Sequence, residues 1–491
     1  MKNPKRILLI SPNITGTKGG VNRIQYGLGI GYIAAILKKN NHVVSVLDSA
    51  LEGWENETEL TEHNAVSIGL SDPEICDKIR TFVPDIVGIS VLFSNLIPHT
   101  LKIAKLVKEV NPNIKVVVGG NHVTNASRIH DYSFIENENV DFAIRGECDY
   151  TFLQFVEDVP IKTISGMMFT ENNKLFVNKQ KNYVDIKTLP NPSWKLFNME
   201  KYFDVGRFHS SHSLSKRVMS IMASRGCPEK CTFCSTPETW GSMVRWRDPH
   251  DIYLEMKQGK ERFNFGEIQF QDDTLTANKR HLLKLCDYLE KIRLPWCTPN
   301  GIKVNYHTKS HPQMFKRMKE SGCYQVTLAC ESGNQDILDN TINKNLKLEQ
   351  IKPAINAAKE AGLIVHTFWI AGFPGETFEQ MEQTVKFAAQ SGADSFSLSV
   401  LNPLPGTPVY DTVMKNNLWW ETSDIHFISQ RNSLIKVDGF DSADQFETWV
   451  NKQNFYLNSL LEKQDHTRAE LVRKNRGPTL MSEADLKLHQ T

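Results

Sequence analysis

The sequence has no long apolar run and no excess of charge of one sign. Lysine and arginine total 57 residues against 56 aspartates and glutamates, for a formal net charge of +1. A membrane-spanning helix needs roughly 18 or more apolar residues, and no segment approaches that length. The N-terminal MKNPKRILLISPN has too short an apolar stretch for a secretory signal. We therefore expect a cytoplasmic protein that acts on a small molecule, with no membrane span and no nucleic-acid partner.

Two further patterns are missing. The nine cysteines are an odd number in a long chain, whereas disulfide frameworks are dense and occur in short secreted domains. The motifs GxGxxG and GxxxxGK(S/T) do not occur at the strand ends of the first 150 residues, which disfavours a dinucleotide or P-loop nucleotide. Three cysteines fall within eight residues and suggest a metal site, whereas six stand singly, at Cys76, Cys148, Cys286, Cys297, Cys323 and Cys330.

Residues 1–150 alternate short apolar runs with amphipathic stretches. The runs, which we expect to be strands, are residues 6–11, 43–48, 85–91, 115–120 and 141–147. Nearly continuous apolarity is typical of strands buried on both faces of a parallel sheet. Five such units predict an α/β, doubly wound sheet whose ligand binds beyond the carboxyl ends of the strands.

The rest of the chain divides into three parts. Residues 151–215 contain the proline-broken LPNPSW and are expected to be a β-rich linker. Residues 216–417 show six strand–helix units, which predict a partial (β/α)6 barrel with its chemistry on the loops after the strands. The tail, 418–491, is expected to be a helical extension that first packs on the barrel mouth and, from about residue 463, becomes a solvated helix or frayed end.

The clustered cysteines, Cys227, Cys231 and Cys234, have the spacing CxxxCxxC. Three thiolates from one short loop can bind three corners of a [4Fe–4S] cube and leave one iron open to a substrate's amino and carboxylate groups. A zinc site is an alternative, which would need a distant fourth ligand such as His209 or His212. A further alternative is that the three thiols are unrelated to one another, which this spacing disfavours. We predict the cluster.

This loop, including Phe233, resembles the signature of the radical S-adenosylmethionine (SAM) superfamily. The resemblance extends to the ends of later strands, so it implies SAM as a second cofactor. Gln271, Asp272 and Asp273 stand where the family binds the methionyl amino group, although the family often has Gly-Gly-Glu there. The motif at Glu331 and Ser332 is similar to the one whose carboxylate contacts the ribose, and Gly372 lies in a fifth-strand motif.

A doubly wound domain before such a barrel resembles the cobalamin-binding domain of class B radical SAM enzymes. The motif DxHxxG, which supplies an axial histidine in other cobalamin proteins, is absent. A departure from the family is Cys148, where glycine is common. A scaffold domain without a ligand is the alternative. The resemblance implies that the strand-end residues that line the cobalamin are Ser90, Gly119, Gly120, His122, Gly146 and Glu147.

Within this branch the chain resembles the methyltransferases of phosphonate and phosphinate antibiotic biosynthesis. The resemblance implies an enzyme that uses a 5′-deoxyadenosyl radical and methylcobalamin to methylate an unactivated carbon, with electrons from a flavodoxin or ferredoxin. Alternatives are a cobalamin-assisted radical cyclase or rearrangement enzyme, and a noncatalytic cobalamin and iron–sulfur sensor. Cationic candidates to bind a phosphonate are Arg207, His209, Arg245, Arg247 and Lys303.

Overall fold

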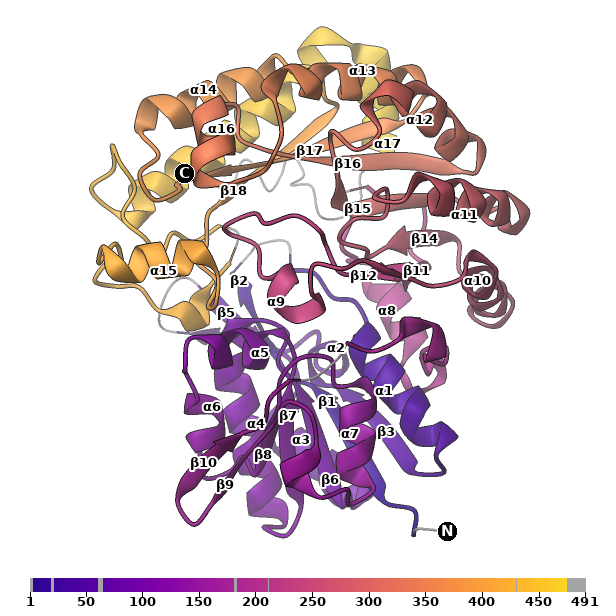
Figure 1. Cartoon of the computed structure of the whole chain (residues 1–491), viewed down its shortest axis with the longest axis vertical. Coiled ribbons are helices and arrows are strands. Elements are labelled where there is room, and N and C mark those ends of the chain that lie inside the picture. Colours follow the sequence, from indigo (N-terminus) through magenta and orange to yellow (C-terminus); the bar gives the residue numbers. More distant parts are fainter. Residues whose placement is uncertain are drawn as a thin grey trace. The chain divides into compact units, whose positions relative to one another are not determined.

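The computed structural model describes residues 3–18, 22–60, 65–180, 183–210, 212–429 and 431–474. The chain forms two compact units (Figure 1). The first comprises residues 1–205 with the short segments 238–241 and 425–428, and the second comprises the remainder. Among the described residues, no helix is both long enough and apolar enough to span a membrane.

The first unit is built on a seven-stranded sheet in the order β10-β9-β8-β7-β6-β1-β3. Five strands are parallel: β1 (Arg6–Ser11), β3 (Val43–Asp48), β6 (Ile86–Ser90), β7 (Lys115–Gly119) and β8 (Phe142–Ile144). The chain moves from β1 outward to β3 and then returns to place β6 on the other side of β1. This reversal is the topological switch point at which doubly wound sheets bind ligands, and it confirms the predicted fold class.

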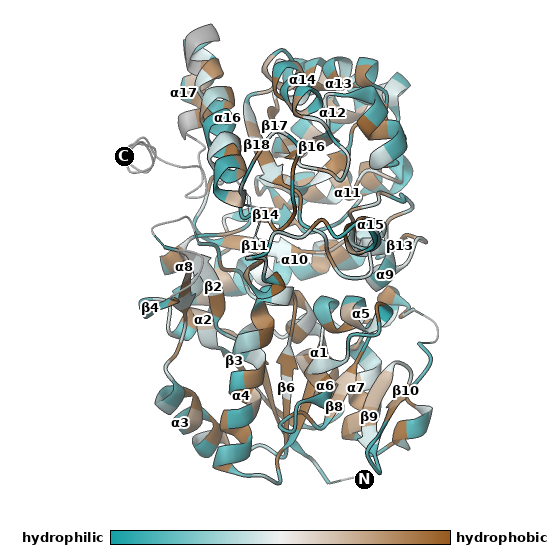
Figure 2. Cartoon of the chain, turned by 90° about the vertical axis from the view of Figure 1, so that its left-hand side faces the viewer, coloured by the Kyte–Doolittle hydropathy of each residue, from teal (hydrophilic) through white to brown (hydrophobic). Residues whose placement is uncertain are grey.

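Helices cover both faces of this sheet. They are α1 (Leu28–Lys39), α2 (Ser49–Glu52), α3 (Asp72–Phe82), α4 (Ile97–Val110), α5 (Asn121–Arg128), α6 (Ser133–Glu136) and α7 (Asp149–Val156). Helix α1 packs on α7, and α3 packs on α4. The strands are strongly apolar, as β6 shows, whereas α3 carries a polar outer face (Figure 2). A smaller antiparallel sheet consists of β2 (Ile14–Thr17), β4 (Glu57–Leu60) and β5 (Ala65–Ile68).

The segment expected to be a linker contributes to this sheet. The antiparallel strands β9 (Met167–Glu171) and β10 (Lys174–Val177) extend it beyond β8. Helix α8 (Met199–Val205) follows and contacts α2. The hydroxyl of Tyr202 in α8 donates a hydrogen bond to the carboxylate of Asp48 at the end of β3. This bond fixes α8 against the carboxyl end of the sheet.

The second unit contains six parallel strands in chain order: β11 (Val218–Ile221), β14 (Glu267–Phe270), β15 (Trp296–Lys303), β16 (Cys323–Glu331), β17 (Ile364–Ala371) and β18 (Ser395–Val400). The helices that alternate with them are α10 (Pro249–Phe263), α11 (Lys279–Ile292), α12 (His311–Glu320), α13 (Ile351–Glu360) and α14 (Phe378–Ala389). This arrangement confirms the partial (β/α)6 barrel. Strand β15 continues through a register shift between Thr298 and Ile302 and ends at Lys303.

Three C-terminal helices complete the second unit: α15 (Pro408–Lys415), α16 (Ala443–Gln464) and α17 (His466–Lys474). Helix α16 pairs with the open edge of the barrel through two asparagines. Asn454 accepts a hydrogen bond from the Leu398 amide at 2.8 Å and donates to its carbonyl at 2.7 Å, and Asn458 does the same for Phe396 at 3.0 Å in both directions. The side-chain amides thus satisfy the exposed edge of β18.

The prediction of a solvated end from residue 463 is wrong for α17. Ala469 and Val472 are buried against Ile364 and Leu461. Arg468 forms an ion pair with Asp394 at 2.6 Å. The apolar stripe of α17 is narrow and the rest of its sequence is charged, so the stripe is easily overlooked. Residues 475–491 of the predicted tail lie outside the described residues.

Candidate functional site

A two-stranded ribbon holds the cysteine loop at the carboxyl end of β11. Strand β12 (Ser224–Arg225) pairs with β13 (Arg245–Trp246), so residues 226–244 form a closed excursion. Gly226 begins the loop with a φ of +105°, a conformation that favours glycine. The amide of Cys234 donates to the carbonyl of Cys231 at 3.1 Å, which makes a tight turn between the last two cysteines.

The three thiols are close enough to influence one another electrostatically. Burial raises the pKa of Cys227 to about 12 and that of Cys231 to about 11. Because thiolates are the metal-binding form, such buried thiols ionise only with a positive partner such as iron. Within the described ranges, no three His, Cys, Asp or Glu side chains form a site for a single metal ion. In a [4Fe–4S] cube, by contrast, each thiolate binds a different iron, so the donor set fits a cluster.

His212 does not suit the role of a fourth zinc ligand. His212 is fully buried, and its carbonyl accepts a hydrogen bond from the Tyr324 hydroxyl at 2.9 Å. Tyr324 is the second residue of β16, so His212 lies at the amino ends of the strands. The cysteine loop follows the carboxyl end of β11. His212 therefore lies at the opposite end of the barrel from the thiols.

The two adjacent aspartates after β14 do different things. Asp272 accepts hydrogen bonds from the Ala223 amide at 3.0 Å and from the Ser224 hydroxyl, which ties it to the start of the cysteine loop. Asp273 accepts one bond from the Thr236 hydroxyl at 3.2 Å, and its Oδ2 is buried with no hydrogen-bond partner among the described residues. Burial raises the pKa of Asp273 to about 7, with a further contribution from Asp272. Asp273 thus has an oxygen to offer a cation.

Two of the predicted cofactor-binding residues, Gln271 and Ser332, have hydrogen-bond partners within the protein. Gln271 is buried and lies 3.5 Å from the Ser220 hydroxyl, and Asn300 donates to the Gln271 carbonyl at 2.8 Å. Ser332 lies 3.1 Å from the Thr384 hydroxyl of α14. These contacts hold the ends of β14, β15 and β16 in register with the barrel.

The fifth-strand motif forms a turn closed by its own glutamate. Glu376 accepts hydrogen bonds from the amides of Gly372 at 2.8 Å and Phe373 at 3.0 Å. Gly372 has a φ of +89°, and a Cβ there would meet the ring of Phe446 at 2.9 Å. The ring of Phe373 also contacts that of Phe233 in the cysteine loop, with centroids 6.0 Å apart. The aromatic residue of the signature therefore packs on this turn.

Sequence reasoning missed two residues beside the cysteines. Lys344 pairs with Glu331 at 2.7 Å, and both side chains are buried. Thr232 bonds through its amide and its hydroxyl to the segment after β16. The sequence offered one signal for Lys344, since it stands between two asparagines, which adopt left-handed conformations more readily than most residues.

In the first unit, the predicted strand-end glycines are required by close packing. Gly120 has a φ of +122°, and a Cβ there would lie 2.6 Å from the Val91 carbonyl oxygen. A Cβ on Gly119 would lie 3.1 Å from the Cys148 sulfur, and one on Gly146 would clash with Gln180. Ser90 ends β6, beside Gly119 at the end of β7. The carboxyl ends of β6, β7 and β8 are therefore lined by backbone and small side chains.

His122 is fixed in place by its neighbours in the first unit. Its Nδ1 lies 2.9 Å from the Ser94 hydroxyl, and its ring contacts Phe134. Burial lowers the pKa of His122 to about 4, so the ring is neutral at pH 7. Nearby, Leu92 and Phe93 are 45% and 57% exposed directly after β6. These exposed apolar side chains, with the glycine-lined strand ends, fit the flat face of a corrin.

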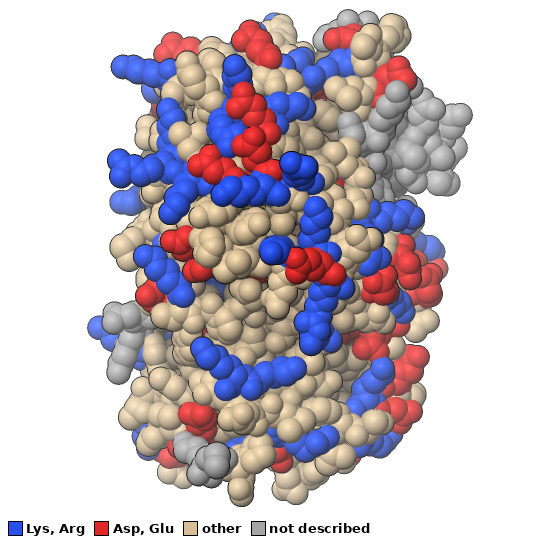
Figure 3. Space-filling view, turned by 90° about the vertical axis from the view of Figure 1, so that its right-hand side faces the viewer, with Lys and Arg blue, Asp and Glu red and all other residues tan. Residues whose placement is uncertain are grey.

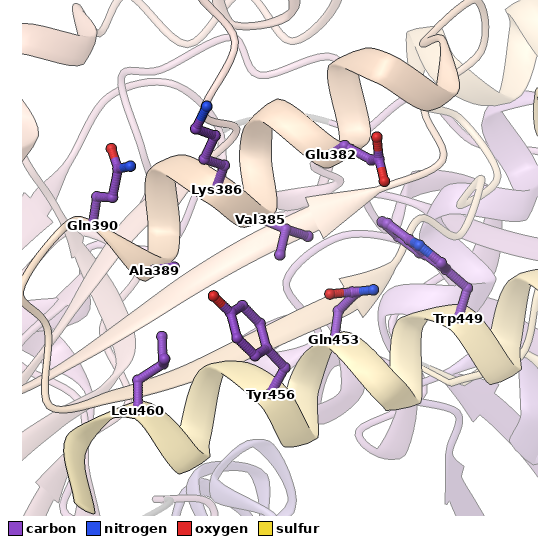
Figure 4. A pocket seen from close by; sticks show the side chains of 9 residues that line it. All are labelled: Glu382, Val385, Lys386, Ala389, Gln390, Trp449, Gln453, Tyr456 and Leu460. Carbon is purple, nitrogen blue, oxygen red and sulfur yellow. The ribbon is translucent and has the colours of Figure 1, made fainter. Parts of the chain in front are cut away.

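Glu147 lies at the edge of this region and is used for packing. Its carboxylate accepts a hydrogen bond from the amide of Val184 at 2.5 Å. It also lines a cavity of about 200 Å³ with Arg145, Tyr150 and Gln180. A larger cavity of about 450 Å³ in the second unit lies between α14 and α16, where Trp449 and Tyr456 face α14 (Figure 4). None of the predicted site residues lines the larger cavity.

Comparisons with known proteins agree with the assignments made for each of the two units. Residues 20–156 match the model of the B12 binding domain, and residues 221–388 match that of the radical SAM superfamily. The chain therefore carries a B12-binding domain followed by a radical SAM domain, as the sequence predicted. The matched domains imply a [4Fe–4S] cluster, SAM and cobalamin as its cofactors.

Individual relatives narrow the class. The chain is 28% identical over 488 residues to a cytidylyl-2-hydroxyethylphosphonate methyltransferase of Streptomyces wedmorensis, covering 93% of this chain and 90% of the relative. It is 24% identical over 480 residues to an anaerobic magnesium-protoporphyrin IX monomethyl ester cyclase of Rubrivivax gelatinosus, covering 96% and 80%. The fold matches the cobalamin-dependent radical enzyme OxsB with a TM-score of 0.70 and 14% identity, over 99% of this chain and 75% of that one. The methyltransferase relative has the higher identity and the larger covered share of its own length, which supports methyl transfer over cyclisation.

Proposed function

We propose that this enzyme methylates an sp³ carbon of a small phosphonate, in a form that carries a nucleotide on its phosphorus. The observation that carries the proposal is the likeness to the phosphonate methyltransferase, which spans nine-tenths of both chains. A cytidylyl-phosphonate is a large anion, so the site must supply cations as well as cofactors.

Different residues of the chain bind the cluster, SAM and the corrin. When bound, the cofactors supply a radical that removes hydrogen and a methyl group that replaces it. Cys227, Cys231 and Cys234 hold the cluster. Asp273 accepts a hydrogen bond from the amino group of SAM, because its Oδ2 has no other partner among the described residues. Glu331 lies at the ribose position of the motif. In the first unit, the strand ends at Gly119 and Gly120 form part of the surface that receives the corrin.

Lys303 is the best candidate to bind the phosphonate. It lies at the carboxyl end of β15 and pairs with Glu229, which also accepts a hydrogen bond from the Tyr306 hydroxyl at 2.7 Å. An anionic substrate can replace Glu229 as the partner of this ammonium group. Arg247 does not suit the role, because its guanidinium pairs with the buried Glu255 and donates to the Met222 carbonyl at 2.9 Å.

The proposal includes an electron donor and a compartment. A flavodoxin or ferredoxin would reduce the cluster, and the oxygen-sensitive chemistry fits the cytoplasm. On the face shown in Figure 3, basic and acidic side chains are interspersed. A small carrier would therefore recognise a local surface rather than a single-sign field.

Product analysis tests the function. The anaerobically reconstituted enzyme is incubated with SAM, methylcobalamin, a one-electron reductant and cytidylyl-2-hydroxyethylphosphonate. We expect 5′-deoxyadenosine and S-adenosylhomocysteine in equal amounts with a methylated product, and none of the three from the Cys231→Ala variant. Free 2-hydroxyethylphosphonate serves as the matched substrate control and should react at least tenfold more slowly. Formation of 5′-deoxyadenosine without S-adenosylhomocysteine would favour the second candidate, cyclisation, which the cyclase relative supports.

A further inference from the structure

The backbone after β16 is shaped to turn one lysine inward. A π-helix, Ile337–Thr341, is followed by Asn343 and Asn345, which have φ angles of +57° and +51°. Asparagine is among the few residues that adopt this left-handed conformation readily. The residue between them, Lys344, is only 6% exposed, and its amide donates to the Leu338 carbonyl at 2.9 Å. A buried lysine held by two left-handed neighbours is a costly arrangement that needs a reason.

The same segment holds the cysteine loop. Thr232, directly after Cys231, donates from its amide to the Ile342 carbonyl at 2.9 Å and from its hydroxyl to the Thr341 carbonyl at 2.7 Å. The Thr232 carbonyl accepts a bond from the Val409 amide at 3.1 Å, which fixes the loop from the other side. Lys344 is two residues beyond Ile342. The position of its ammonium group is therefore coupled to that of Cys231.

Lys344 and Glu331 form a buried ion pair at 2.7 Å. The carbonyls of Thr341 and Ile342, just before Lys344, hold Thr232 beside Cys231, so the pair belongs to the segment that fixes the cysteine loop. A buried ion pair adds little net stability. The pair therefore makes better sense as an electrostatic device beside the cluster.

We propose that Lys344 is a positioning residue that raises the reduction potential of the iron–sulfur cluster. The inference rests on the radical SAM function and adds a residue to it. The cluster takes one electron from a low-potential one-electron donor and gains one negative charge, which a nearby ammonium group stabilises in a dry site. Glu331 limits the effect by partly neutralising that charge.

The test is an anaerobic redox titration of the cluster, followed by electron paramagnetic resonance, on SAM-free protein with measured iron and sulfide. Lys344→Met should lower the ratio of reduced to oxidised cluster at the wild-type midpoint at least tenfold, which is 59 mV for one electron. Glu331→Gln leaves the ammonium uncompensated and should shift the ratio in the opposite direction. The double variant should lie between the two single ones. Lys347→Met is the matched control, because Lys347 forms an exposed ion pair with Asp339 on the same segment.

The opposite signs separate a charge effect from a structural one. If Lys344→Met loses its cluster, Glu331→Gln still tests the inference by its direction. Equal midpoints for wild type, Lys344→Met and Glu331→Gln would overturn it, as would shifts of the same sign or an equal shift in Lys347→Met. Those results would leave the function intact, because the wild type would still hold a cluster of about four irons. A wild type without iron would overturn both.

Discussion

Replacing one or the other of two adjacent aspartates should separate cluster retention from SAM binding. Asp272 ties the cysteine loop to β14 through the Ala223 amide and the Ser224 hydroxyl. Hydrogen bonds to a charged acceptor contribute about 1.5–3 kcal/mol each. Burial raises the pKa of Asp272 to about 6, and this desolvation offsets part of that gain. We therefore expect Asp272→Ala to cost the closed loop a net ~2 kcal/mol, which is roughly 30-fold in its equilibrium constant.

The assay is anaerobic release of iron to a chelator from reconstituted protein. Asp272→Ala should lose iron roughly 30-fold faster than the wild type, the factor derived from its lost hydrogen bonds. Asp273→Asn should lose iron at the wild-type rate but bind SAM roughly 10- to 100-fold more weakly, since it loses one charge-assisted bond. Stable iron in Asp272→Ala, or rapid loss in Asp273→Asn, would refute this division of roles.

Three further predictions concern the scaffold. Asn454→Ala removes two hydrogen bonds to the edge of β18 and should lower the free energy of unfolding in urea by about 2 kcal/mol. The control variant Asn451→Ala, at an exposed position of the same helix, should change it by less than about 0.5 kcal/mol. Equal effects of the two substitutions would contradict the role of Asn454 at the edge. Burial raises the pKa of Asp48 to about 6. The unfolding free energy of the wild type should therefore fall by about 2 kcal/mol relative to that of Asp48→Asn as the pH rises from 4 to 7. Parallel curves of unfolding free energy against pH for the two proteins would contradict this prediction. Gly120→Ala should abolish corrinoid retention because its Cβ meets the Val91 carbonyl, whereas Gly29→Ala, with open space around it, should retain corrinoid; retention by both variants would show that the strand end is not the binding surface.

The sequence predicted the strands well because their apolarity is nearly continuous. Strands buried on both faces leave few other interpretations, and the observed β1, β3, β6 and β7 agree closely with the expected ranges. Helix α17 was mispredicted because its buried stripe is narrow within a charged sequence. The extension of β15 through Gly301 depends on a register shift with its neighbour, which a single segment does not encode.

The candidate site divides in the same way. The cysteine spacing is local, so the sequence was sufficient to propose a cluster. Asp272 and Asp273 are chemically identical in the sequence, and only the position of Ala223, after the neighbouring strand β11, distinguishes the anchor from the open carboxylate. Lys344 was missed because its contact with Glu331 joins residues 13 apart through a π-helix and two left-handed asparagines.

The most direct test of the account is metal and corrinoid analysis of the protein isolated without oxygen. The account predicts about four irons, as much sulfide, and bound corrinoid. The Cys231→Ala variant should lose the iron and keep the corrinoid, because the B12-binding domain and the cysteine loop are separate parts of the chain. Wild-type protein with stoichiometric zinc in place of iron, or with iron that survives in Cys231→Ala, would contradict it.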